Sequence, residues 1–246
     1  GDDSFKFKAN LEDALVKGRA YAKFTAKSGG MDCVAIRKKL CALELLNNVE
    51  ITKRAAQIER KAPFGVLIVG HSSIAKSAFT KVVFNAYGSL FGLDRTDAGC
   101  YSRNSFDEFW SGFNSSQWCI RMDDIAFQNP AKTTQIDTSI IAMLNIINNV
   151  PFVPNQASLE AKGTTPVLAK LVVATTNTQG LNTDEYFSCP LAANRRLPYV
   201  VQLTPKKEHL HANQVFIEPS TLRCEDGKFP DYWHISVQEI VPEIRL

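Results

Sequence analysis

A short apolar run that leads into a loop opened by glycine is the feature that most constrains how this chain can fold. Residues 64–69 read FGVLIV, a continuous run typical of a strand buried on both faces. The loop 70–77 reads GHSSIAKS, and apolar residues at helical spacing follow it. This order matches the phosphate-loop pattern G-x-x-x-x-G-K-[ST] at every defined position except one. The sequence therefore predicts a strand–loop–helix unit that holds phosphate groups.

The loop predicts roles for individual residues, because backbone N–H groups and the positive end of a helix together cradle phosphates. Lys76 is expected to reach the β- and γ-phosphates of a nucleotide, and the Ser77 hydroxyl to ligate Mg²⁺. The residues expected to contact the nucleotide are Gly70, His71, Ser72, Ser73, Ile74, Ala75, Lys76, Ser77 and Ala78.

Ala75 is the one departure from the pattern, which has glycine before the lysine. That position often takes a positive φ, which costs a residue with a Cβ about 1–2 kcal/mol. Either the loop absorbs this strain or the site is weakened. The sequence leaves both open, and it does not say whether Ala75 is an engineered substitution.

Alternating strand and helix patterns predict the fold class. Three further apolar runs, 118–122, 171–174 and 197–201, read as strands, and apolar residues recur at helical spacing within 78–90 and 136–147. Such alternation predicts an α/β fold with a mostly parallel sheet flanked by helices.

The rest of the chain divides around this core. Residues 1–61 read as a helical N-terminal segment that breaks near 28–30, residues 62–205 as the core, and residues 206–246 as a C-terminal extension of it. The N-terminal helices either pack on the core or lead away from it as a stalk to another module.

Composition excludes several classes of protein. Lys plus Arg is 28 and Asp plus Glu is 25, so the net charge of +3 argues against a strongly basic nucleic-acid-coating protein. Average apolar and charged fractions exclude a disordered, collagen-like or coiled-coil chain. The sequence contains neither a membrane-spanning run nor a signal peptide. Six scattered cysteines predict reduced thiols in a reducing compartment.

Polar residues follow two of the predicted strands. Residues 118–122 end in Asp123 and Asp124, where one carboxylate can hold Mg²⁺ through water and the other can orient or deprotonate an attacking water. Asn177 follows the strand 171–174, where an amide beside the γ-phosphate can position that water. Taken alone, the acidic pair is as typical of a surface loop, and the Thr/Asn-rich segment of a turn.

In combination, these elements resemble the superfamily 3 helicases of positive-strand RNA viruses. The closest likeness is to the picornavirus-type 2C NTPase as carried by dicistroviruses and related picorna-like viruses. The likeness covers about residues 62–205, and the first 60 and last forty or so residues match only loosely. The stretches that carry it are 106–130 (FDEFWSGFNSSQWCIRMDDIAFQNP), 152–163 (FVPNQASLEAKG), 171–178 (LVVATTNT) and 189–199 (CPLAANRRLPY).

The resemblance implies a P-loop NTPase with an AAA+-like core and assigns catalytic roles. Gly70, Lys76 and Ser77 fall in its first motif, Asp123 and Asp124 in its second, and Asn177 in its third as the sensor of the γ-phosphate. Arg195 and Arg196 fall where the family has arginine fingers, which reach the nucleotide of a neighbouring subunit in a ring, six being the family expectation. Without the family context, two surface arginines would be the simpler reading.

The resemblance also implies partners. Lys162 and Gly163 lie in the segment that such helicases direct into the central pore, where a lysine can contact the RNA backbone. Other viral replication proteins and a membrane are further expected partners. An N-terminal amphipathic anchor is expected upstream of Gly1, and a C-terminal docking helix is expected to be cut. The whole protein is then expected at membrane-bound replication sites in the host cytoplasm, and this chain to be soluble.

No zinc is predicted, unlike in enterovirus members of the family, because Cys224, His209, His211 and His234 lack ligand spacing.

The leading hypothesis is a ring-forming viral ATPase that couples ATP hydrolysis, with Mg²⁺, to RNA unwinding or remodelling. A second is a membrane-tethered replication scaffold and RNA-binding module whose ATPase is weakened by Ala75. A third is a cellular AAA-type ATPase that acts on protein.

Overall fold

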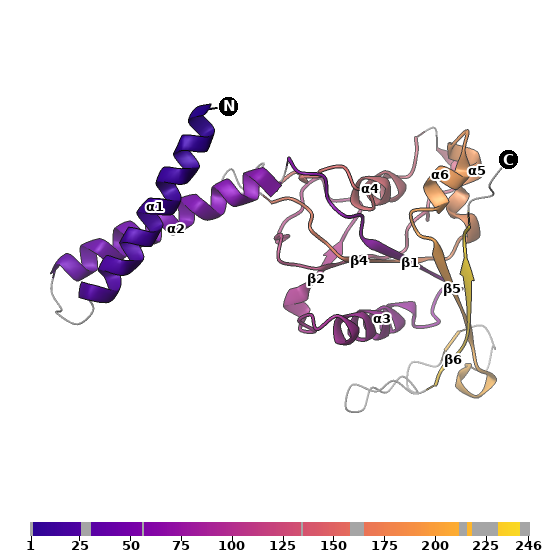
Figure 1. The fold of residues 1–246 in the computed structure, drawn as a ribbon. Coiled ribbons are helices and arrows are strands. Elements are labelled where there is room, and N and C mark those ends of the chain that lie inside the picture. Colours follow the sequence, from indigo (N-terminus) through magenta and orange to yellow (C-terminus); the bar gives the residue numbers. More distant parts are fainter. Residues whose placement is uncertain are drawn as a thin grey trace.

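A computed structural model describes residues 2–25, 31–55, 57–133, 135–157, 165–211, 216–217 and 231–241 (Figure 1). Within these residues no helix is both long enough and apolar enough to cross a membrane. The fold class expected from the sequence is confirmed, since a mostly parallel sheet lies between helices.

One six-stranded sheet organises the core, in the order β2-β3-β4-β1-β5-β6. Neighbouring strands from β2 through β5 run parallel, and β6 pairs antiparallel with β5 at the edge. The strands are β1 (Phe64–Val69), β2 (Cys100–Arg103), β3 (Cys119–Met122), β4 (Leu171–Thr176), β5 (Tyr199–Pro205) and β6 (Trp233–Glu239).

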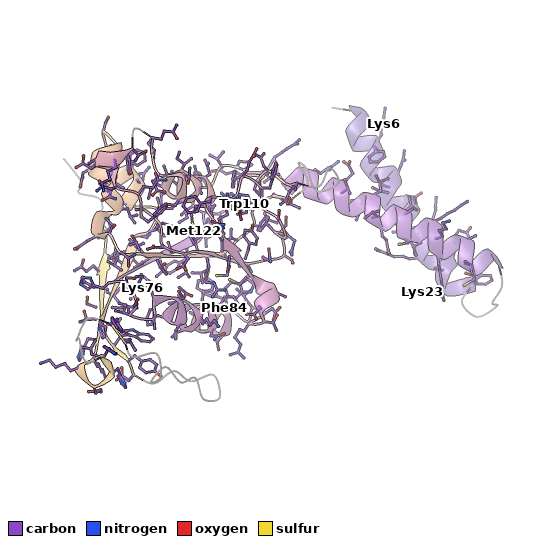
Figure 2. The ribbon with its side chains drawn as sticks, turned by 180° about the vertical axis from the view of Figure 1, so that it is seen from behind. Lys6, Lys23, Lys76, Phe84, Trp110 and Met122 are labelled. Atoms are coloured by element: carbon purple, nitrogen blue, oxygen red, sulfur yellow. The ribbon has the colours of Figure 1, made fainter. Side chains whose placement is uncertain are left out.

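Helices cover the two faces of the sheet, and a separate apolar core lies under each. The helix α3 (Lys76–Leu90) packs Phe79 and Phe84 onto one face, which we call the α3 side. The helix α4 (Thr138–Ile146) packs Ile140 and Met143 onto the other, the α4 side. Figure 2 shows Phe84 on one side of the sheet and Met122 and Trp110 on the other.

The N-terminal helices α1 (Asp2–Thr25) and α2 (Met31–Ala55) pack on each other and extend away from the sheet (Figure 1). Leu11 and Leu15 are buried in α1, and Arg19 Nε lies 3.2 Å from a carboxylate oxygen of Glu44. The expected break at 28–30 lies outside the described residues.

A single arginine fixes the connection between this hairpin and the core. Arg60 is 9% exposed and donates three hydrogen bonds near the carboxyl end of α4, to the carbonyls of Asn145, Ile146 and Val150, at 2.8, 2.7 and 3.0 Å. A cation at a helix C-terminus is favoured by the helix dipole and satisfies carbonyls that the helix leaves unpaired.

Short helical segments complete the chain between and after the strands. They are η1 (Asp97–Gly99), η2 (Pro130–Lys132), η3 (Gln179–Asn182), α5 (Thr183–Tyr186), α6 (Pro190–Asn194) and η4 (Lys207–His209).

Two strands lie outside the apolar runs. The strand β2 reads CYSR and lacks such a run, and β6 reads WHISVQE with only Trp233 buried, as suits an edge strand. The run expected at 197–201 becomes β5 only from Tyr199, because backbone N–H groups of Arg196 and Leu197 still bond carbonyls of the preceding turn.

Candidate active site

The strand order brings the predicted site residues to one edge of the sheet. Since β4 pairs parallel with both β1 and β3, the carboxyl ends of these three strands are adjacent. The phosphate loop follows β1, Asp123 and Asp124 follow β3, and Asn177 follows β4. Parallel α/β sheets place ligand sites at this edge.

The phosphate loop has the backbone that its sequence pattern requires. Ser73 and Ala75 lie in the left-handed region at φ 61° and 60°. A Cβ at Gly70 would crowd the end of the Ile74 side chain and lie 3.0 Å from the Leu203 carbonyl oxygen, so Ile74 would have to move. The Ala75 methyl group is partly buried against the apolar core on the α3 side. Ala75 therefore occupies the conformation in which glycine is normally found, as the sequence led us to expect.

Residues far along the chain support the loop from beneath. Trp233 Nε1 on β6 donates to the Ile74 carbonyl at 2.7 Å, and the Ile217 amide donates to the Ser73 carbonyl at 3.1 Å. The Trp233 ring also packs edge-on against Phe79 of α3. Sequence reasoning missed this support, although a tryptophan followed by alternating polar residues is itself a strand signal.

A chain of hydrogen bonds joins three of the predicted residues. Lys76 Nζ lies 2.5 Å from Asn177 Oδ1, and Asn177 Nδ2 donates to Asp124 Oδ1 at 2.6 Å. Lys76 also donates to the carbonyls of Gly70 and His71 at 3.0 and 2.9 Å. Burial lowers the pKa of Lys76, and the negative charges of Asp124 and Asp123 partly oppose that shift. An ammonium, an amide and a carboxylate thus converge where a γ-phosphate and its attacking water would lie.

Asp123 is held by a residue that the sequence did not single out. Thr175 Oγ1, 1% exposed on β4, donates to Asp123 Oδ1 at 2.6 Å and accepts the Asp124 amide at 2.8 Å. One hydroxyl thereby fixes both the direction of Asp123 and the backbone between the two carboxylates.

The donor set around Asp123 fits a magnesium ion. Ser77, at the start of α3, Asp123, directly after β3, and Thr175 on β4 line one pocket of about 240 Å³. Mg²⁺ prefers hard oxygen ligands, keeps several waters and takes only one or two carboxylates from protein. A hydroxyl and a carboxylate with room for waters meet that requirement.

The two predicted arginines lie at the opposite edge of the sheet. Arg195 and Arg196 precede β5, and a Cβ on Gly65 at the start of β1 would collide with the Arg196 carbonyl. The six residues of β1 span about 20 Å, so neither arginine shares an edge with Lys76 of the same chain. Arg195 is exposed, whereas Arg196 Nη1 donates to the Ile147 carbonyl at 3.0 Å, at the end of α4.

Some expected site residues cannot be placed. Lys162 and Gly163, expected to contact RNA, and Cys224 lie outside the described residues. Within the part of the chain that the structure describes, no group of three or more His, Cys, Asp or Glu side chains is arranged to hold a metal ion.

Comparisons with known proteins agree with this geometry. Residues 66–178 match the RNA helicase family, a span that runs from β1 to just past Asn177. Over 156 residues, 61% of this chain, the sequence is 30% identical to the RNA1 polyprotein of Cowpea mosaic virus (strain SB). The chain spans 8% of that polyprotein's length. The matched span, the sheet order and the phosphate loop together confirm the expected resemblance of this chain to the superfamily 3 RNA helicases of picorna-like viruses.

Proposed function

We propose that this chain is an NTPase that hydrolyses ATP with Mg²⁺ and couples hydrolysis to unwinding or remodelling RNA during viral replication. The observation that carries the proposal is the hydrogen-bonded series Lys76, Asn177 and Asp124, drawn from the carboxyl ends of three adjacent strands. Hydrolysis of a phosphoanhydride needs these same functions, namely charge neutralisation, a water-orienting amide and a carboxylate.

Each residue has a distinct task in this proposal. The Lys76 ammonium holds the β- and γ-phosphate oxygens, and the backbone from Gly70 to Ala78 surrounds the phosphates. Asp124 accepts a hydrogen bond from the attacking water, while Asn177 fixes the direction of that carboxylate through their 2.6 Å bond. Ser77 and Asp123 hold Mg²⁺, which neutralises charge on the phosphates when it is bound. Thr175 holds the Asp123 carboxylate through its 2.6 Å hydrogen bond.

The arginine that neutralises the transferred phosphoryl group comes from a second copy of the chain. Arg195 is exposed about 20 Å from the site of its own chain, at the far end of β1, which suits action in trans. Arg196 instead donates to the end of α4, so we assign it the task of positioning Arg195. A head-to-tail contact of this kind generates a ring when its rotation closes, and we propose a closed ring of six copies.

RNA binding belongs to the same proposal. We assign contact with the RNA backbone to Lys162 and Gly163, because they match the family's RNA-binding segment in sequence. The whole protein acts with other viral replication proteins at membrane-bound sites in the host cytoplasm. Crosslinking of labelled single-stranded RNA tests the assignment: Lys162→Ala should lower the yield, and an unchanged yield would contradict it.

Phosphate release from ATP tests the hydrolytic proposal. Lys76→Ala should lower turnover to background, because it removes the ammonium that the phosphate loop places beside Asn177 and Asp124. Lys81→Ala on the exposed surface of α3 is the matched control and should retain wild-type turnover. Full activity in Lys76→Ala would refute the assignment.

A second function is favoured by one specific observation, the left-handed conformation of Ala75 at φ 60°. Strain of about 1–2 kcal/mol in the loop would weaken nucleotide binding and leave a membrane-tethered scaffold and RNA-binding module. Phosphate release by the natural chain and by Ala75→Gly separates the two. A large gain on restoring glycine favours the scaffold, and strong activity in both chains favours the motor.

A further inference from the structure

Arg121 is a charged residue within an otherwise apolar strand, and the proposed reaction gives it no task. It lies on β3 two residues before Asp123, on the same face of the sheet, because side chains alternate along a strand. Its guanidinium reaches across the α3 side. Arg121 Nη2 lies 3.2 Å from Ser102 Oγ on β2, and Nη1 lies 3.5 Å from Thr80 Oγ1 on α3.

Those contacts place Arg121 in the wall of the pocket that holds the proposed magnesium ligands. The pocket of about 240 Å³ is lined in part by Ser77, Thr80, Ser102, Arg121 and Asp123. Within the described residues, Arg121 forms no ion pair with a carboxylate, since Asp123 turns to Thr175 instead. The Arg121 guanidinium, which carries several N–H donors, therefore lies among the hydroxyl groups of Ser77, Thr80 and Ser102.

This set of groups is suited to a tetrahedral oxyanion. A guanidinium donates two parallel hydrogen bonds to oxygens of one anion, and hydroxyl groups donate to the others. Asp123 at the rim would repel a free anion, but its charge is offset once a divalent cation is held there. Arg121 and Asp123 are two residues apart, about 7 Å along an extended strand, and the two side chains line the same pocket.

A second pocket of about 270 Å³ continues from the first toward solvent. The two share Ser102, Arg103 and Asp123 in their walls, and the second extends to the exposed rings of Phe106 and Phe127. Arg103 is 9% exposed, and its Nε and Nη1 atoms have no hydrogen-bond partner. Arg103 thus lines both pockets, while its Nη2 atom donates to the Asp107 carbonyl and its guanidinium lies over the Trp110 ring.

We propose that the Arg121 pocket is a subsite for inorganic phosphate, which receives the phosphate after hydrolysis and before its release past Arg103. The proposal rests on the hydrolytic function proposed above. No bond forms or breaks in this step. The phosphate moves from the metal edge to the Arg121 guanidinium, and Ser102 and Thr80 exchange their hydrogen bonds with Arg121 for hydrogen bonds to the anion.

Equilibrium dialysis of radiolabelled inorganic phosphate, with and without ADP and Mg²⁺, tests the subsite without any need for turnover. Arg121→Gln should weaken phosphate binding about tenfold or more, as expected for the loss of a charge-assisted hydrogen-bond pair. Ser102→Ala should weaken it by a smaller factor. Lys81→Gln, which removes an exposed charge from α3 outside the pocket, should leave it unchanged. Circular dichroism melting of each variant verifies that it folds.

The outcomes separate this proposal from the hydrolytic one. Phosphate binding that is equal in wild type and a folded Arg121→Gln or Ser102→Ala chain overturns the subsite, whatever the ATPase activity. Phosphate binding that depends on Arg121 in a chain that fails to bind ADP supports the subsite and overturns the proposed hydrolysis. Weaker phosphate binding in Arg121→Gln, with its ADP affinity unchanged, supports both the phosphate subsite and the proposed hydrolysis.

Discussion

Thr175 shows how a single side chain can organise a site without facing the substrate. Its hydroxyl both donates to Asp123 and accepts the Asp124 amide, and it is almost completely buried between the strand ends. Lys76, Asp124 and Asn177 could be predicted because each falls at a recognisable position after a strand. Thr175 could not, because a threonine within a strand is also what β-propensity alone favours.

Thr175→Val should therefore impair the site, although the two side chains have nearly the same size and shape. The isosteric substitution deprives the part-buried Asp124 amide of its acceptor, which costs about 1 kcal/mol of unfolding free energy, and it releases the exposed Asp123 carboxylate to solvent. It should also raise the Mg²⁺ concentration needed for half-maximal phosphate release. Urea denaturation and a magnesium titration measure the two effects. Thr204→Val on the exposed side of β5 is the control, and equal behaviour of the two variants would contradict the assignment.

Cys100 provides a pH-dependent probe of the charge on Arg121. A hydrogen bond from the Cys119 thiol and the nearby Arg121 charge lower the pKa of Cys100 to about 7. The reactive thiolate is present above that pKa and lost as pH falls through it. Iodoacetamide labelling of Cys100, followed by mass spectrometry, should thus have a midpoint near pH 7, and Arg121→Gln should move it upward. An unmoved midpoint would place the Arg121 charge too far from Cys100 to act on it.

At the scale of elements, apolar runs in the sequence predicted the buried strands but did not predict the edge strands β2 and β6. The strands β1, β3 and β4 are mostly apolar, with Arg121 interrupting β3 and two threonines ending β4, because both faces of the sheet are covered by helices. The edge strands β2 and β6 need fewer apolar residues, since each has fewer neighbours to pack against. What could not be predicted at all is the contact between β6 and the phosphate loop, since 159 residues separate Trp233 from Ile74.

Trp233→Phe should separate the two roles of Trp233 on β6, which packs against Phe79 and donates a hydrogen bond to the Ile74 carbonyl. The phenyl ring keeps most of the packing against Phe79, but the Ile74 carbonyl loses its donor in a buried position. We expect a loss of about 1–3 kcal/mol in unfolding free energy and weaker binding of a fluorescent ATP analogue. Thermal melting and a fluorescence titration measure these. Stability lost with nucleotide affinity unchanged would show that β6 supports the core but not the loop.

At the scale of the molecule, the proposed nucleotide site draws residues from both edges of the sheet, and these edges lie apart in a single chain. Lys76 and Asp124 lie at the carboxyl edge, whereas Arg195 lies at the amino edge beside the end of α4. Arg60 ties the N-terminal hairpin to that same helix end. Arginines that act in trans could be predicted only from the family resemblance. The distance of Arg195 from the phosphate loop is set by the folded sheet and has no signal in the sequence.

Phosphate release by an equal mixture of Lys76→Ala and Arg195→Ala chains tests the shared site most directly. Each variant alone should be nearly inactive at a concentration at which the wild-type chain is active. In mixed rings, about a quarter of the contacts join an intact phosphate loop to an intact Arg195, as random assembly of a head-to-tail interface requires. The account predicts recovery of up to that fraction of wild-type turnover. No recovery on mixing, or full activity of Arg195→Ala alone, would contradict it.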